Sequence, residues 1–392
     1  MALQRSRFAN HPLKFIFTTW FLASLPFRLT GIVFYYLPSA TRANRSCRQA
    51  VATKLLNFWF KFATTVEFRT PKSLEPGAEA DRFVLIDPNK IKAKATSTST
   101  PSPYTGPLTT NPAIKPAKVA AFWYESPPPA DSAPPPLVVL HFHAGAYVLG
   151  GARTEMEAGW GPIALSKQLA CPVLMPEYRL SNKSDRTTSF PAALQDAVTA
   201  YTYILHALNI PPRNIILSGD SAGGNLVVAL LRYIAEYSEQ THLPLPRAAL
   251  LWSPWADLTT PAGAIDTHRN VDSDFLFGGL RDWGVDSYTP DDWARSHQYY
   301  AYISPAGNEF RTSVPIFIQT SKQEILYDSH VALARGLQDV GCTVEFVEIE
   351  KGPHDVFLGA ELLGLLEAGN EIIGKAKDFV LRHGDAQEES QG

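Results

Sequence analysis

The sequence has few cysteines and little net charge. Its 392 residues include three cysteines, Cys47, Cys171 and Cys342, which are too few and too scattered for a disulfide framework or a cysteine-based metal site. A formal net charge of −3 gives no overall electrostatic reason to expect a nucleic-acid partner. Because 45% of the residues are apolar, the chain can still bury a large core, in one big domain or two ordinary ones.

The first part of the chain is poor in acidic residues and lacks a long unbroken apolar run. Residues 1–72 contain eleven Lys or Arg and a single acid. Two apolar runs, 15–27 and 29–38, are separated by Pro26 and Arg28, which disfavours a simple transmembrane span. No small-residue cleavage site follows these runs cleanly, which disfavours a cleavable signal peptide.

Residues 1–80 are therefore expected to form a helical cap or lid, with a second aromatic-rich helix over 50–67 that needs a partner surface. Two interpretations stay open beside the lid. Aromatic and basic residues together are typical of helices at a membrane interface, so residues 13–62 offer contact with a membrane surface, such as that of the endoplasmic reticulum, in an intracellular protein. A true span is the other.

After Asp81 short apolar runs alternate with helix-like segments. This alternation predicts a mostly parallel sheet with helices on both faces, forming a catalytic domain over 81–384 before a polar tail, 385–392. A Ser-, Thr- and Pro-rich stretch, 93–116, is expected to be a flexible surface loop, and 261–300 a cap insertion. The expected strands are 82–86, 119–124, 137–142, 172–176, 215–218, 248–252, 315–320 and 343–349, and the expected helices of this part are 192–208, 224–237, 329–340 and 359–382.

The most informative motif is Gly219-Asp220-Ser221-Ala222-Gly223-Gly224, which lies between an apolar strand and an apolar helix. This is the context of a G-x-S-x-G nucleophile elbow, a tight turn that exposes a serine hydroxyl. A side chain at Gly219 or Gly223 would crowd so tight a turn. Ser221 is therefore the candidate nucleophile.

A serine needs a base to take its proton and an acid to hold that base. The base is expected in a loop after the last strand, and His354 follows the strand 343–349 directly. The acid is expected after the preceding strand, where Glu324 is close to the strand end. Asp328, a turn further on at a helix entry, is the alternative acid.

Backbone N–H groups must stabilise the negative charge that develops on the substrate oxygen. Ala222, next to the nucleophile, is one candidate donor. Gly145 and Ala146, in the small-residue loop after the strand 137–142, are the others. His143 in the same loop is expected to support the loop rather than to transfer protons.

Together these motifs resemble the hormone-sensitive-lipase-like branch of the α/β-hydrolase superfamily (alpha/beta hydrolase fold-3), especially its fungal esterase-like members. The matching pieces, in chain order, are His143-Ala144-Gly145-Ala146-Tyr147, Glu177-Tyr178-Arg179-Leu180, Phe190-Pro191-Ala192-Ala193-Leu194, Gly219 to Gly224, Ser253-Pro254-Trp255-Ala256-Asp257-Leu258, Ser304-Pro305 and Gly352-Pro353-His354.

The resemblance implies an α/β-hydrolase fold with an eight-stranded sheet and a helical cap, no metal or other cofactor, and hydrolysis of carboxylic esters through an acyl-enzyme. The chain departs from the family pattern in two places. Where the family has H-G-G-G, this chain has His-Ala-Gly-Ala, and the two added methyl groups are expected to narrow the site. Where the family has the acid motif Gly-x-x-Asp, this chain has Ser321-Lys322-Gln323-Glu324.

A small apolar ester of lipid, steryl or polyketide type is the expected substrate, because the cap segments are rich in Phe and Trp. Two other functions stay open. One is acyl transfer to an alcohol in natural-product metabolism, and the other is ligand binding by a catalytically silent receptor of the same fold. The presence of His354 disfavours the receptor.

Overall fold

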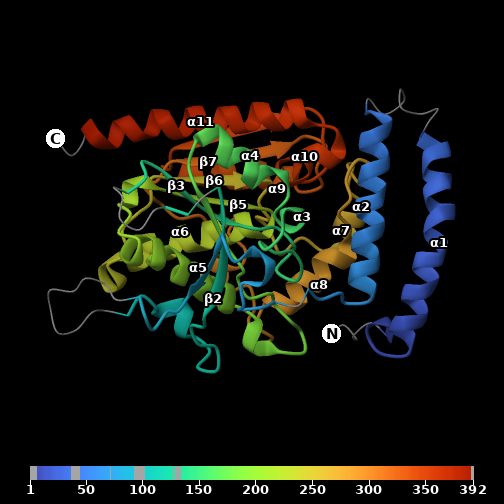
Figure 1. The fold of residues 1–392 in the computed structure, drawn as a ribbon, viewed down its shortest axis with the longest axis horizontal. Helices are drawn as coiled ribbons and strands as arrows, with labels where there is room; N and C mark the ends of the chain where they lie inside the picture. Colours follow the sequence, from blue (N-terminus) through green and yellow to red (C-terminus); the bar gives the residue numbers. More distant parts are fainter. Residues whose placement is uncertain are drawn as a thin grey trace.

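The computed structural model describes residues 7–36, 45–70, 72–91, 102–125, 127–128 and 134–389. Within these residues the chain is organised around one eight-stranded sheet (Figure 1). The first part of the expected loop 93–116 and the last three residues of the expected polar tail lie outside the described residues.

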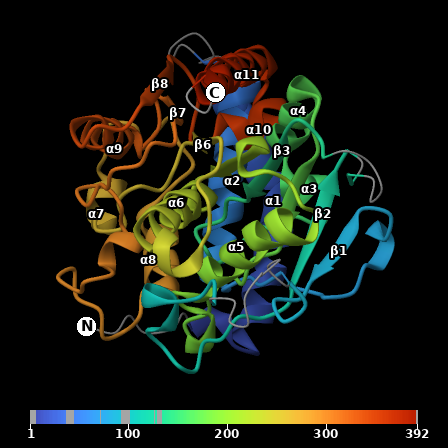
Figure 2. The ribbon, with the colours of Figure 1, turned by 90° about the vertical axis from the view of Figure 1, so that its left-hand side faces the viewer.

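The strands follow the apolar runs of the sequence, and each begins and ends within two residues of its expected bounds. Their order in the sheet is β1-β2-β4-β3-β5-β6-β7-β8, which Figure 2 shows running from β8 at one side to β1 at the other. Strands β3 to β8 are parallel to one another, while β2 runs antiparallel to β1 and β4. The bounds are β1 (Phe83–Ile86), β2 (Val119–Tyr124), β3 (Val138–Phe142), β4 (Val173–Pro176), β5 (Ile215–Asp220), β6 (Ala248–Trp252), β7 (Ile316–Ser321) and β8 (Val344–Ile349).

Helices cover both faces of the sheet, so the expected mostly parallel α/β architecture is confirmed. Helices α5, α6 and α9 bury their apolar residues in the core on one face, and α4, α10 and α11 do so on the other. Continuous apolar strands need cover on both faces, which explains the two cores. The helices are α1 (Leu13–Tyr36), α2 (Cys47–Thr65), α3 (Glu155–Ala158), α4 (Trp160–Leu169), α5 (Ala192–Thr202), α6 (Ala222–Thr241), α7 (Ala262–Asp266), α8 (Gly278–Tyr288), α9 (Tyr327–Asp339), α10 (Val356–Leu363) and α11 (Leu366–Glu389).

The register of the central strands brings their carboxyl ends to one edge. Phe142 at the end of β3 pairs with Gly219 of β5, and Asp220 at the end of β5 pairs with Trp252 at the end of β6. In open parallel sheets ligands bind at this edge. The loops that follow β3, β5, β7 and β8 therefore meet where a site is expected.

The N-terminal helix differs from the expectation. Instead of two apolar pieces broken at Pro26 and Arg28, α1 is a single helix of 24 residues. A proline removes one backbone hydrogen bond but leaves the turns on either side intact. Arg28 stays within the helix because its Nε donates a hydrogen bond to Ser24 Oγ at 2.9 Å and its guanidinium lies over the ring of Phe58 in α2, 5.3 Å from the ring centre.

Two further expectations are wrong in part. Residues 102–116 are not a free surface loop, because Leu108 and Ile114 are buried and their carbonyl groups accept hydrogen bonds from Gln195 Nε2 at 2.8 and 2.9 Å. The helix expected over 359–382 is two helices. Gly364 ends α10 in the left-handed conformation, with φ of +69°, which glycine adopts without a steric penalty.

Candidate active site

The turn between β5 and α6 holds Ser221 in a strained conformation. Its φ of +49° and ψ of −114° lie outside the regions that side chains prefer, and its N–H donates to the carbonyl oxygen of Trp252 at 2.9 Å. A Cβ on Gly219 would overlap the backbone of Gly223, and one on Gly223 would overlap the carbonyl of Phe142. The two glycines are therefore needed for close backbone approach, and the turn leaves the serine hydroxyl at its tip.

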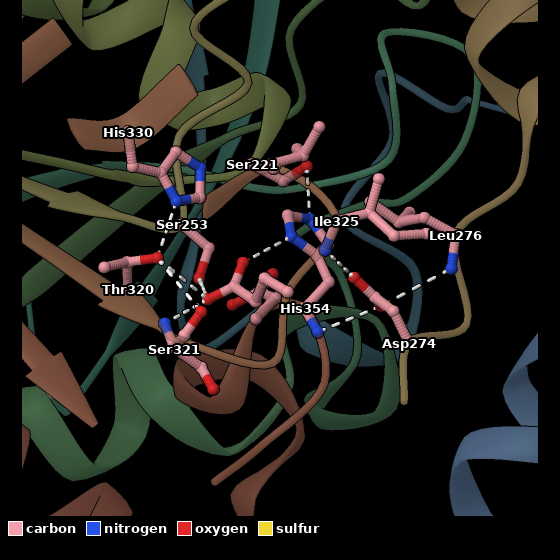
Figure 3. A network of polar contacts seen from close by, with 12 residues as sticks. Ser221, Ser253, Asp274, Leu276, Thr320, Ser321, Ile325, His330 and His354 are labelled. Atoms are coloured by element: carbon pink, nitrogen blue, oxygen red, sulfur yellow. Dashed lines mark hydrogen bonds and ion pairs between the residues drawn. The ribbon is translucent and has the colours of Figure 1, made fainter. Parts of the chain in front are cut away.

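Ser221, His354 and Glu324 form a continuous hydrogen-bonded chain (Figure 3). His354 Nε2 lies 2.8 Å from Ser221 Oγ, and His354 Nδ1 lies 2.9 Å from Glu324 Oε2. The second carboxylate oxygen of Glu324 accepts hydrogen bonds from Ser253 Oγ at 2.8 Å and from the N–H of Ser321 at 2.6 Å. These bonds fix the carboxylate, which in turn orients the imidazole toward the serine.

Asp328, the alternative acid, lies elsewhere. Its exposed carboxylate forms a two-pronged ion pair with Arg269, with N–O distances of 2.6 Å, and lies 3.4 Å from His268. The guanidinium of Arg269 lowers the pKa of Asp328. Asp328 also stands in the first turn of α9, where an acid is favourable. The structure therefore brings Glu324, and not Asp328, to His354.

The electrostatic surroundings suit a base that becomes positively charged for a moment. Burial opposes a charge on His354, but the hydrogen bond and the charge of Glu324, with smaller contributions from Asp274 and Asp355, raise the pKa of His354 above its usual value. Burial raises the pKa of Glu324, and its bond to His354 opposes this. The pair therefore stabilises the imidazolium that forms when Ser221 gives up its proton.

The candidate oxyanion donors lie beside the nucleophile. Gly145 and Ala146 line the same cavity as Ser221. Ala222 is the first residue of α6, so its N–H is not used by the hydrogen bonds of the helix itself. The loop is held in place because the buried hydroxyl of Tyr147 donates to Asn225 Oδ1 in α6 at 2.6 Å. An anionic oxygen above Ser221 would therefore meet backbone donors on a fixed loop.

His143 supports this loop. Its ring stacks on Tyr178 with 4.2 Å between ring centres, and its Nδ1 lies 2.7 Å from the carbonyl oxygen of Ala144. Burial lowers the pKa of His143 to about 3, so the ring is neutral near pH 7. The hydroxyl of Tyr178 donates to the carbonyl of His143 at 2.7 Å. These contacts fit a structural role for His143 in the loop.

One important residue, Asp274, was not singled out from the sequence. It lies between α7 and α8, is fully buried, and its Oδ1 accepts from the N–H of Phe275 at 2.7 Å and of His354 at 3.0 Å. Its Oδ2 accepts from the N–H of Ile325 at 2.8 Å. Asp274 thus joins the segment between β6 and β7 to the loops that carry Glu324 and His354 (Figure 3).

A second unexpected feature is a pair of buried carboxyl groups next to the nucleophile and the base. Asp220 and Asp355 interact with each other in the buried interior, and His141 Nε2 lies 3.3 Å from Asp220 Oδ1. Burial raises the pKa of Asp220 to about 7 and raises that of Asp355 well above its usual value. Asp355 also accepts a hydrogen bond from the N–H of Leu358 at 3.0 Å, which begins α10. The interaction of the two carboxyl groups therefore links the elbow to the segment that follows His354.

The site opens into two neighbouring spaces. The cavity beside Ser221 has a volume of about 60 Å³. A groove of about 690 Å³ lies between α2, α4 and α10. Phe60, Phe275 and Leu358 line both, so they form the boundary between cavity and groove. Phe60 belongs to α2, while no residue of α1 lines either space.

We infer that the cap over the site consists of α2 together with α7 and α8. Phe60 of α2 stacks on Phe275 with 5.3 Å between ring centres, and Asn57 Nδ2 donates to the carbonyl oxygen of Phe275 at 2.8 Å. Leu280 of α8 lines the cavity beside Ser221. Among the described residues, no three His, Cys, Asp or Glu side chains are grouped to hold a metal ion.

Comparison with known proteins gives the same architecture. The alpha/beta hydrolase fold family model matches residues 139–358. The chain is 32% identical to an acetyl-hydrolase of Streptomyces hygroscopicus, over 54% of this chain and 64% of the relative. It is 34% identical to the esterase LipU of Mycobacterium tuberculosis, over 57% of this chain and 72% of the relative. It is 24% identical to an esterase of Gibberella moniliformis, over 55% of this chain and 66% of the relative.

Solved structures agree. The esterase EstE5, soaked with p-nitrophenyl butyrate, is 26% identical and superposes with a TM-score of 0.54 over 68% of this chain and 82% of EstE5. An esterase of the bacterial hormone-sensitive lipase family superposes with a TM-score of 0.56 at 21% identity, and the superposition covers 91% of this chain and 97% of that esterase. The second similarity extends over most of both chains and shows the fold.

Proposed function

Because the chain belongs to the alpha/beta hydrolase fold family, in the hormone-sensitive-lipase-like branch, we propose that it is a serine esterase that cleaves carboxylic esters through an acyl-enzyme. The observation that carries the proposal is the hydrogen-bonded chain from Ser221 through His354 to Glu324, with distances of 2.8 and 2.9 Å. A binding protein of the same fold has no need for a base in contact with a serine. The names of the relatives, esterases and an acetyl-hydrolase, support the same reaction class.

The geometry supports the following sequence of steps. Ser221 Oγ attacks the ester carbonyl carbon while its proton passes to His354 Nε2, and the carbonyl oxygen becomes an oxyanion that faces the N–H groups of Gly145, Ala146 and Ala222. The carbon–oxygen bond to the alcohol then breaks, and His354 gives its proton to the departing alcohol. Water repeats the sequence on the acyl-serine, which releases the acid and restores the serine hydroxyl.

We further propose that the substrate is an apolar ester with a short acyl group. A volume of about 60 Å³ beside Ser221 holds only a few non-hydrogen atoms, and Ala144 and Ala146 add methyl groups to its wall. The groove of about 690 Å³ is of the size that binds whole small molecules and is lined by Leu56, Trp160 and other apolar residues. The groove would therefore take the apolar alcohol portion, of the lipid, steryl or polyketide kind.

Two isomeric esters, octyl acetate and ethyl octanoate, test this assignment. They have the same formula and nearly the same hydrophobicity, but the long chain lies on the alcohol side in one and on the acyl side in the other. We expect kcat/KM to be at least about tenfold higher for octyl acetate, since two or more methylenes must find room on the acyl side with the other isomer. A preference for ethyl octanoate would overturn the short-acyl assignment while leaving the esterase reaction in place.

The reaction class itself has a separate control. Ser221→Ala should lose hydrolysis of both isomers, and the wild type should release acid and alcohol in equal amounts. Unchanged hydrolysis in Ser221→Ala would overturn the serine mechanism. Release of alcohol without acid, in the presence of a second alcohol, would assign the protein to acyl transfer instead.

A further inference from the structure

Helix α1 stands at the outer edge of the molecule, beside α2 and away from the sheet (Figure 1). It packs on α2 through Phe17 and Phe21, whose rings lie 6.2 and 4.4 Å from the ring of Phe62. Phe21 is the single buried residue among its 24. The stacked rings make α1 part of the folded protein, yet nearly all of its surface faces outward.

The outward face of α1 is apolar and carries no charge. Its two charged residues, Lys14 and Arg28, are each seven residues from the buried Phe21, and a seven-residue spacing places side chains on one stripe of a helix. Arg28 lies over the ring of Phe58 in α2, which confirms that this stripe faces α2. The opposite face presents large exposed apolar side chains, namely Phe15, Ile16, Leu22, Phe27 and Phe34.

The exposure is too extensive for a helix in water. Phe27 is 82% exposed and Phe34 is 72% exposed, and a continuous apolar face of this size marks a docking surface. By length and composition the helix is apolar enough to cross a membrane, and nearly all of its most apolar part is exposed. Its 24 residues extend about 36 Å, compared with about 30 Å for the hydrocarbon core of a bilayer.

The charge of the N-terminal part of the sequence indicates what covers this face. Residues 1–66 contain nine Lys or Arg and no Asp or Glu, whereas the rest of the chain is acidic in balance. Anionic lipid headgroups attract such basic segments. A second protein chain docked on this face would need no such excess of positive charge.

We propose that α1 is a membrane-binding helix whose outward face inserts into an anionic phospholipid bilayer. Helix α2 then connects the membrane to the site, because its Phe58 and Phe62 contact α1 while its Leu56 and Phe60 line the groove next to the Ser221 cavity. Apolar esters concentrate in bilayers, so this arrangement holds the groove one helix away from them.

Flotation of the full chain with lipid vesicles tests the proposal. The vesicles contain phosphatidylcholine alone or with about one quarter phosphatidylserine. The wild type should float with the mixed vesicles, more than with phosphatidylcholine alone. The double variant Phe27→Glu with Phe34→Glu should float at least about tenfold less, since it places two acids on the inserted face. A wild type that stays with the vesicle-free fraction, or a double variant that floats equally, would overturn the proposal.

Leu381→Glu is the matched control, because Leu381 is an exposed leucine on α11, 46% accessible and far along the chain from α1. It should float like the wild type. Both variants should still react at Ser221 with a fluorophosphonate, which shows that they are folded. If the double variant instead converts a vesicle-independent dimer to a monomer, the face belongs to a second copy of the chain and the membrane assignment is wrong.

Discussion

Replacing Asp274 by asparagine should weaken the connection between the cap and the catalytic loops. Asparagine keeps an oxygen for the N–H groups of Phe275 and His354 but turns an amide NH₂ toward the N–H of Ile325, where the wild type has a hydrogen bond of 2.8 Å. Losing one bond to a charged acceptor costs about 1.5–3 kcal/mol. We expect Asp274→Asn to lower the Tm by roughly 2–4 °C.

The same change should alter catalysis in a defined direction. The charge of Asp274 contributes to the raised pKa of His354, so its removal lowers that pKa. Hydrolysis needs neutral His354, and the acidic limb of the kcat/KM profile should therefore move to lower pH. The plateau of kcat should fall by about tenfold, because the loops that carry Glu324 and His354 are less well held.

Asp257→Asn is the matched control for this prediction. The half-buried carboxylate of Asp257 also accepts several hydrogen bonds, among them one from the N–H of Thr259 at 2.7 Å and one from Thr260 Oγ1 at 2.7 Å. Neither of these bonds reaches the loops that carry Glu324 and His354. Asp257→Asn should lower the Tm but leave the acidic limb of the kcat/KM profile at the same pH. An Asp274→Asn enzyme with unchanged profile and kcat, or equal shifts in both variants, would refute the role assigned to Asp274.

Three further predictions test the acid, the buried carboxyl pair and the narrowed loop. Glu324→Gln should lower kcat by about 10⁴-fold. Asp328→Asn changes only an exposed ion pair and should leave ester hydrolysis within about twofold of the wild type. The reverse order of the two effects would move the acid to Asp328. Because the pKa of Asp220 is raised to about 7, the folded state keeps a proton that the unfolded state loses from about pH 4 upward, and this pair loses stability as the pH rises between those values. Asp355→Asn replaces a titrating carboxyl group by a neutral amide and tolerates the left-handed φ of +60°. Its Tm relative to the wild type should therefore rise from pH 4 to pH 7 in thermal melts, and a constant difference would contradict the raised pKa values of the pair. Ala146→Gly removes a methyl group from the cavity wall, at a backbone φ of +52° that glycine adopts readily. The ratio of butyrate ester hydrolysis to acetate ester hydrolysis should therefore rise about fivefold. An unchanged ratio would show that this wall does not limit the size of the acyl group.

Which residues come together at the candidate site could be predicted largely from local sequence. A tight turn between strand and helix needs glycines for backbone contact, and this need is visible in the letters around Ser221. Chain order after β7 and β8 was enough to select Glu324 and His354. Sequence alone left Asp328 open, because it lies only four residues beyond Glu324; its ion pair with Arg269 depends on how the segment between β6 and β7 folds.

Features that depend on contacts between distant segments were not predictable in the same way. Asp274 stands among several acids in 261–300, and its bonds to the N–H groups of Ile325 and His354 appear only after the loops have met. The raised pKa of Asp220 arises from burial in the folded chain, which brings it next to Asp355, 135 residues later in the sequence. The continuity of α1 through Pro26 is not visible in the sequence either, because a proline commonly kinks or ends a helix and the packing of α1 on α2 forms only in the folded chain.

The central claim is that Ser221 carries the acyl group during ester hydrolysis, and the most direct measurement is mass spectrometry of the protein quenched in acid during turnover of p-nitrophenyl acetate. The account predicts one added acetyl group in the wild type, located by fragmentation on the peptide that contains Ser221. In Glu324→Gln the acetylated fraction should be greater where deacylation slows more than acylation. Ser221→Ala should carry none and should not hydrolyse the ester. Hydrolysis at the wild-type rate by Ser221→Ala, or an acetyl group on another residue that accounts for turnover, would contradict the account.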